Sequence, residues 1–185
     1  MVDKKDIEGL IFKLLKALGE NPLREGLKET PKRVANMYEE MFNQSEADEH
    51  ELIKIFNEEE ISPSGLVEVR DIPFCSLCEH HLLPFKGVVH IKYIPQNGKI
   101  LGISKFARIV NYFASGLQVQ ERITNKIAKF IFSGLSPKWV EVTVEAEHLC
   151  MTVRGVKAQG ALTKTVATCG SLALKSKENE EYECF

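Results

Sequence analysis

The sequence lacks a long apolar run and lacks an excess of either charge, and both absences narrow what the protein can do. No stretch of its 185 residues approaches the roughly 20 apolar residues that a membrane-spanning helix requires. Its formal net charge is −2, from 24 lysines and arginines against 26 acidic residues. No overall positive field therefore attracts nucleic acid or acidic membranes, so an anionic ligand must be bound by a local group of bases.

Cysteine is scarce and odd in number. The N-terminus interleaves charged with apolar residues and lacks the unbroken apolar segment of a secretory signal, so we expect a cytoplasmic protein. In that reducing compartment cysteines serve as ligands or free thiols more often than as a disulfide framework. The five cysteines are Cys75, Cys78, Cys150, Cys169 and Cys184.

Residues 1–62 are predicted to form a helical arm. Apolar residues recur at spacings of three and four between residues 7 and 18, which is typical of an amphipathic helix. A second helix is indicated by Thr30-Pro31, a cap followed by a proline in the first turn, and by an apolar stripe that ends at Phe42. The acidic stretch 46–60 is interpreted as a third, short helix or a linker.

Residues 63–175 are predicted to form the main domain, followed by a polar tail over residues 176–185. Alternating apolar residues indicate strands from Val67, over 87–94, over 140–150 and over 162–168. Helices are predicted from Ser104, as a cap, and from Gln118. The order strand, strand, helix, helix, strand, strand predicts an α+β domain with one antiparallel four-stranded sheet and two helices on one face.

Strand periodicity brings two polar residues onto the apolar face of the third strand. If the alternation that begins at Val140 continues to its end, His148 and Cys150 point inward together. A bound metal is one way to stabilise such a pair in a core. For this pair alone, a hydrogen-bonded core histidine beside a small apolar cysteine is the commoner arrangement.

A second group of metal-ligating side chains follows the first predicted strand. The spacing of Cys78 and His81 suits two ligands of one tetrahedral zinc ion. Cys75 leaves two alternatives open: a closed structural site with Cys75 as the fourth ligand, and a redox pair of Cys75 with Cys78. The redox pair is disfavoured because no βαβ unit is predicted here, whereas spacing does not exclude the closed site.

Two further histidines favour a catalytic over a structural metal site. His80 adjoins His81, and His148 lies two residues from Cys150. A site with three protein ligands keeps a position for a water, whose pKa the metal lowers to about 7. A nearby imidazole can transfer protons at that pH, whereas a closed structural site needs no such group.

With these motifs in view, the sequence resembles the GTP cyclohydrolase I family. The resemblance extends from about Thr30 to Thr168 through six ordered segments, at residues 30–34, 78–81, 93–95, 102–105, 118–122 and 148–155. It implies the tunnelling fold, the conversion of GTP and water to formate and 7,8-dihydroneopterin triphosphate, and a homodecamer with active sites between subunits. It implies no nucleic-acid or membrane partner.

The resemblance also implies roles for individual residues. One Zn²⁺ per subunit would be held by Cys78, His81 and Cys150. His148 would protonate the guanine ring nitrogen beside the attacked carbon, and His80 would assist ribose opening. Glu79 would orient its neighbours.

Substrate contacts are implied in the same way. Glu121, with the amide at Gln120, resembles the family's reader of guanine, and otherwise it is an ordinary surface charge. The contacts to the triphosphate correspond to Ser104, Lys105, Arg108 and Arg154, with Arg33 supplied by a neighbouring subunit.

Two positions depart from the family pattern. Asn36 stands where many members have a lysine near the triphosphate, and Cys75 is unusual at its position. Three alternatives to the cyclohydrolase therefore remain: the closed zinc module, the redox protein, and a relative that binds nucleotide without turnover. The ligand set also accepts iron(II) in place of zinc.

Overall fold

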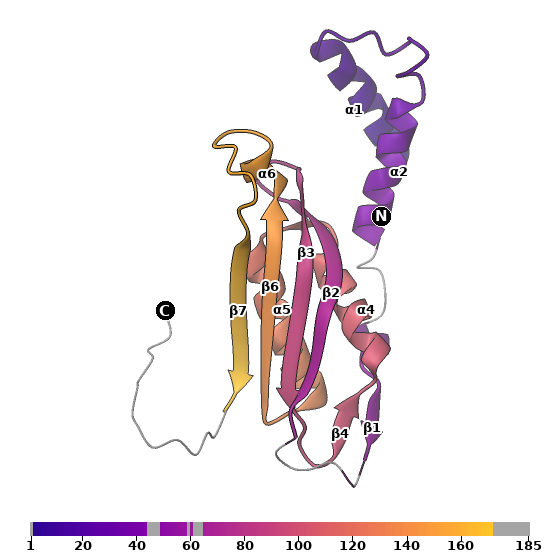
Figure 1. Cartoon of the computed structure of the whole chain (residues 1–185). Helices are drawn as coiled ribbons and strands as arrows, with labels where there is room; N and C mark the ends of the chain where they lie inside the picture. The colour runs from indigo at the N-terminus through magenta and orange to yellow at the C-terminus, as the bar shows by residue number, and fades with distance from the viewer. Residues whose placement is uncertain (1, 44–48, 59, 61–64, 172–185) are drawn as a thin grey trace.

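A five-stranded sheet, with strand order β5-β2-β3-β6-β7, forms the centre of the molecule (Figure 1). The computed structural model describes residues 2–43, 49–58, 60 and 65–171. The long strands are β2 (Val67–Cys78), β3 (Pro84–Ile94), β6 (Trp139–His148) and β7 (Thr163–Gly170), each antiparallel to its neighbour. The predicted antiparallel sheet is confirmed. The additional strand, β5 (Leu117–Gln118), pairs in parallel with the end of β2 and is too short to show periodicity.

One face of the sheet is covered by α4 (Ile103–Ala114) and α5 (Gln120–Leu135), as predicted. The alternate residues of β6 that face these helices are fully buried, because successive side chains of a strand point to opposite faces. They are Val140, Val142, Val144 and Ala146. The apolar core therefore lies between the sheet and the two helices.

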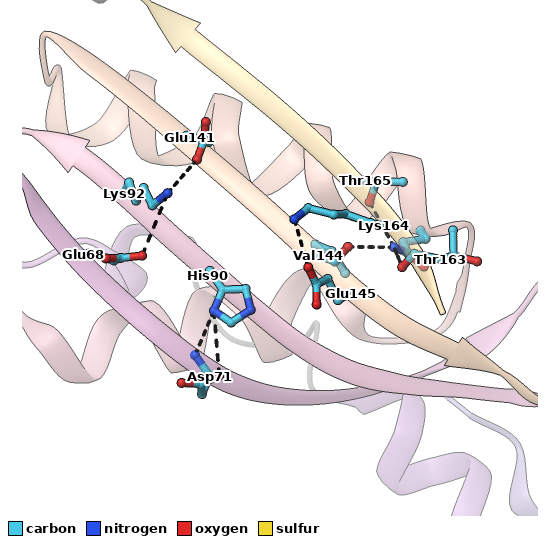
Figure 2. A network of polar contacts seen from close by, with 11 residues as sticks. Glu68, Asp71, His90, Lys92, Glu141, Val144, Glu145, Thr163, Lys164 and Thr165 are labelled. Atoms are coloured by element: carbon cyan, nitrogen blue, oxygen red, sulfur yellow. Dashed lines mark hydrogen bonds and ion pairs between the residues drawn. The ribbon is translucent and has the colours of Figure 1, made fainter. Parts of the chain in front are cut away.

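The other face of the sheet carries cross-strand ion pairs (Figure 2). The Lys92 Nζ lies 3.3 Å from a Glu141 oxygen and 4.0 Å from a Glu68 oxygen, and the Lys164 Nζ lies 3.0 Å from Glu145. Each exposed pair contributes little to stability. Together, opposite charges on neighbouring strands favour the observed register and keep this face polar.

The helical arm projects beyond one end of the sheet (Figure 1). Its two predicted helices are present as α1 (Lys4–Ala17) and α2 (Thr30–Asn43), which pack on each other. Thr30, expected as the cap, is the first helical residue. The C-terminal end of α2 is fixed to the domain because the Ser115 hydroxyl and the Gly116 N–H both donate to the Met41 carbonyl, at 3.1 and 3.0 Å.

The acidic stretch at the end of the predicted arm contains both a helix and a strand. These are α3 (Glu49–Leu52) and β1 (Ile55–Asn57), which pairs with β4 (Lys99–Leu101). The predicted tail over residues 176–185, with Cys184, lies outside the described residues. None of the helices in the described part of the chain has the length and apolar character needed to cross a bilayer.

Two local predictions are wrong. The strand does not continue to Cys150: β6 ends at His148, and Cys150 lies in the short helix α6 (Leu149–Thr152). Ser104 does not cap α4, because Gly102 occupies the N-cap position without a side-chain cap and Ser104 lies within the first turn. Both errors concern element ends, which periodicity defines poorly.

Candidate metal centre and active site

A tight turn between β2 and β3 brings two metal-ligating residues together. The Cys78 N–H donates to the Leu83 carbonyl at 2.9 Å, and the Cys78 carbonyl accepts from the N–H groups of His81 and Leu82. Leu82 adopts a left-handed backbone conformation, with φ of 56°, which closes the turn. Cys78 is therefore buried at the end of the strand while His81 remains exposed beside it.

Cys150 completes the group from α6. The ligand atoms of Cys78, His81 and Cys150 all lie within 4.8 Å of one another. Burial raises the pKa of the Cys150 thiol, and the neighbouring Cys78 sulfur raises it further. A cation between the two sulfurs would remove this repulsion, and two thiolates with one imidazole match the ligands that zinc prefers. These residues fit a tetrahedral metal with one position left open.

Cys75 lies apart from this group. On β2 it is exposed on the face opposite the buried side chains, and it pairs with Lys86 of β3. Residues three apart on a strand point to opposite faces, so the Cys75 and Cys78 sulfurs diverge. Within the described residues, the metal-ligating group does not include Cys75. This placement disfavours both the closed four-ligand site and the redox pair.

His148 is held at the end of β6 by contacts on its face and its edge. Its ring stacks on the Phe85 ring with 4.6 Å between centroids and 4° between planes. Its Nε2 lies 2.8 Å from the Oε1 of Gln120. Burial lowers the pKa of His148, although the nearby Glu121 carboxylate opposes this shift. The neutral imidazole is therefore favoured.

The first turn of α5 is joined to the β2–β3 turn by an ion pair that sequence reasoning missed. The two terminal nitrogens of Arg122 donate to the two carboxylate oxygens of Glu79, at 2.7 and 3.3 Å. The pair lowers the pKa of Glu79 and raises that of Arg122. Glu79 lies between Cys78 and His80 in the chain, so Arg122 restrains the turn that carries both.

The predicted GTP-binding residues are distributed over several elements. Glu121 is exposed in the first turn of α5, whereas the Gln120 side chain is only 1% exposed. The Arg154 Nη1 lies 3.3 Å from the Nε2 of His81, which brings this predicted phosphate ligand to the metal group. His80 is also near, with its Nδ1 3.8 Å from the Cys78 sulfur.

The remaining predicted phosphate ligands lie on other elements than those that carry the metal group. Lys105 donates to the Glu51 carbonyl at 2.5 Å. In the described part of the chain, no hydrogen bond or ion pair joins the metal group to the residues that lie on α4 and α2, namely Ser104, Lys105, Arg108 and Arg33.

Comparison with known proteins finds similarity to one enzyme family, both in the family model and in individual relatives. The model of the family described as GTP cyclohydrolase I matches residues 7–184. The GTP cyclohydrolase 1 of Thermoanaerobacter pseudethanolicus is 50% identical over 181 residues, covering 98% of this chain and 95% of that protein. The GTP cyclohydrolase 1 of Carboxydothermus hydrogenoformans is 52% identical over 174 residues, covering 94% and 89%. A solved structure of the archaeosine synthase QueF-Like in the apo form aligns with a TM-score of 0.47 and 24% identity, covering 60% of this chain and 99% of that one.

Proposed function

The chain belongs to the GTP cyclohydrolase I family, and we propose that it hydrolyses GTP to formate and 7,8-dihydroneopterin triphosphate. Its α+β architecture is the tunnelling fold of that family. The observation that carries the proposal is that the ligand atoms of Cys78, His81 and Cys150 lie within 4.8 Å of one another. The half-buried His148 lies two residues before Cys150 in the chain. This arrangement supports a metal-assisted hydrolysis rather than a structural zinc module.

Cys78, His81 and Cys150 would hold one Zn²⁺ per subunit. When bound, zinc would act as a Lewis acid that lowers the pKa of a water at its open position to about 7. Cys78 comes from the end of β2 and Cys150 from α6, while His81 lies in the turn that the Cys78 carbonyl stabilises. Ligands from two separate parts of the chain therefore depend on the fold for their spacing.

His148 would transfer the proton to the guanine ring nitrogen beside the carbon that is attacked. Its neutral form is favoured by burial, and stacking on Phe85 limits ring rotation. A positioned imidazole that exchanges protons near neutral pH is well suited to general acid–base catalysis. His80 is exposed near the Cys78 sulfur, where its imidazole would assist ribose opening.

Recognition of GTP would divide between a carboxylate and a set of bases. Glu121 would accept hydrogen bonds from the guanine N1–H and exocyclic amine, a donor pair that adenine does not present. The triphosphate would be bound by Ser104, Lys105, Arg108, Arg154 and the partner subunit's copy of Arg33. Asn36 provides no charge there, so one phosphate contact expected from the family pattern is weaker in this chain.

We propose a homodecamer, the assembly that the family resemblance implies, and the incomplete packing of the arm in a single chain supports association. α1 is amphipathic but buries none of its residues, and Leu10, Leu14 and Leu18 are 61%, 50% and 69% exposed. β7 lies at one end of the strand order, where its outer edge has no paired strand in the described part of the chain. Both features favour association with further subunits.

The direct test of this function is to incubate the zinc-loaded protein with GTP and measure formate. We expect one formate per GTP consumed, together with a product that becomes a fluorescent pterin on oxidation. ATP is the matched control and is expected to release none, because Glu121 would find no complementary donors. GTP binding without formate release would instead support a relative that has lost turnover.

A further inference from the structure

We propose that Gln120 is a positioning residue whose side chain fixes His148 as the Nε2–H tautomer and leaves Nδ1 as the nitrogen that exchanges the proton. The inference rests on the proposed function, in which His148 transfers a proton, and it adds which ring atom does so and what holds it. Gln120 is buried at the start of α5, and its Oε1 lies 2.8 Å from the His148 Nε2.

The orientation of the Gln120 amide is determined by its partners. Its Nε2 lies 3.0 Å from the Val144 carbonyl oxygen and 3.0 Å from the Thr163 carbonyl oxygen; both residues are labelled in Figure 2. Carbonyl oxygens only accept hydrogen bonds, so the group facing them must be the NH₂. The amide oxygen therefore faces His148.

A chain of hydroxyl groups supports the same orientation. The Thr124 hydroxyl donates to the Gln120 backbone carbonyl at 2.8 Å. The Thr165 hydroxyl, 2.6 Å from that of Thr124, must then donate to it, which leaves a Thr165 lone pair for the Gln120 Nε2 at 3.1 Å. Every donor in this network meets an acceptor, as a buried polar network requires.

The tautomer of His148 follows from this network. An amide oxygen can only accept, so the His148 Nε2 beside it must carry the hydrogen. In the neutral ring Nδ1 then holds the lone pair and is the atom able to take up and release a proton. The nearly parallel stack on Phe85 fixes the ring plane. α5 and β7 thus hold the ring's edge through Gln120, and Phe85 of β3 holds its face.

The same hydrogen bonds limit what the Gln120 side chain can contribute to guanine binding. Its NH₂ has two hydrogens for three acceptors, so no amide hydrogen remains for guanine. Its oxygen already accepts from His148. Gln120, which is only 1% exposed, can therefore offer guanine no side-chain donor, and its side chain acts through His148.

NMR of metal-free protein with isotope-labelled histidine nitrogens tests the tautomer directly. At a pH about two units above the ordinary histidine pKa, we expect a pyrrole-like Nε2 and a pyridine-like Nδ1 for His148. His90 is an internal reference, because its Nδ1 accepts the Asp71 N–H at 3.2 Å (Figure 2) and it must also be the Nε2–H form. In Gln120→Met the His148 signals should shift toward a mixture of tautomers, while those of His90 stay unchanged.

Kinetics of the zinc-loaded variants provide a second readout. Gln120→Met should lower kcat about tenfold to a hundredfold with little change in the KM for GTP. Gln96→Met, in the exposed turn after β3, is the matched control and should retain wild-type kcat.

The outcomes distinguish this inference from the proposed function. If the wild type releases formate and His148→Ala does not, yet Gln120→Met keeps wild-type kcat and His148 signals, the positioning role is wrong and the function stands. If the wild type releases no formate, the proposed function fails. The tautomer assignment is tested separately, and a pyrrole-like Nδ1 of His148 in the NMR experiment would overturn it. If Gln120→Met does not fold, the wild-type spectrum decides the assignment, and a pyrrole-like Nδ1 of His148 would overturn the proposal.

Discussion

At the residue scale, the position of Cys75 separates an open metal site from a closed one. The side chain lies on the polar face of β2, away from the Cys78 sulfur. We therefore expect Cys75→Ala to keep one zinc per subunit and wild-type turnover, measured by metal analysis and formate release. Loss of the metal in this variant would indicate that Cys75 closes the site and that the site is structural.

The ion pair of Arg122 with Glu79 gives a second prediction for a single residue. Arg122→Met leaves the Glu79 carboxylate without its two donors and frees the turn that carries Cys78 and His81. We expect zinc transfer to a chelator to become about tenfold faster. The control is Lys126→Met, at an exposed position one turn further along α5. Equal transfer rates in the two variants would show that the pair does not support the site.

The sequence predicts the metal ligands better than it predicts the residues that position the site. Cys78 and His81 share a local spacing, so a pattern reveals them. Gln120 and His148 are 28 residues apart, and Glu79 and Arg122 are 43 apart. A glutamine and an arginine at the start of a helix have no local signal for a distant partner, because their pairing depends on how the helix packs on the sheet.

At the element scale, the end of β6 shows where periodicity stops being informative. Alternation predicts the inward face up to His148 but not the change to α6 that contains Cys150. The end of the strand is decided by its neighbours: His148 pairs with Phe85 next to the first residue of β3, and β7 begins opposite Ala146. Beyond His148 the ladder ends, so the chain turns and brings Cys150 to the metal group.

The close approach of β3 to β6 gives a prediction for the sheet. A Cβ added at Gly87 would collide with the Glu145 carbonyl oxygen and lie 2.7 Å from the Ala146 Cα. Because both are backbone atoms, Gly87→Ala should lower the free energy of unfolding by about 2 to 4 kcal/mol. Gly9→Ala, in α1 with nothing within 4 Å, should instead raise it by about 0.5 to 1 kcal/mol. Urea unfolding midpoints measure both, and equal midpoints would contradict this packing.

At the scale of the whole molecule, the single chain leaves its arm incompletely packed, and one proposed phosphate ligand lies on that arm. α1 buries no residue, and Arg33 lies on α2 in the arm that projects beyond the sheet (Figure 1). The sequence predicts the arm helices from their apolar stripes, but a stripe does not identify which surface covers it. The proposed assembly would cover these stripes and bring Arg33 to a neighbouring site.

Co-expression of two inactive variants tests whether sites are shared between subunits. In the proposed site Arg33→Ala would lack a phosphate ligand and Cys150→Ala would lack a metal ligand, so each alone should have low turnover. Hybrids of the two should recover formate release, because some sites would combine an intact arm with an intact metal group. Hybrids of His148→Ala with Cys150→Ala are the control and should not recover it. No recovery in the first hybrid would place Arg33 outside a shared site.

The central claim is that three side chains hold the metal while His148 moves the proton. Zinc content and formate release, measured together on purified His148→Ala and Cys150→Ala, test it most directly. We predict that His148→Ala keeps one zinc per subunit and releases no formate, and that Cys150→Ala loses both. Normal turnover by His148→Ala, or full zinc retention by Cys150→Ala, would contradict this account.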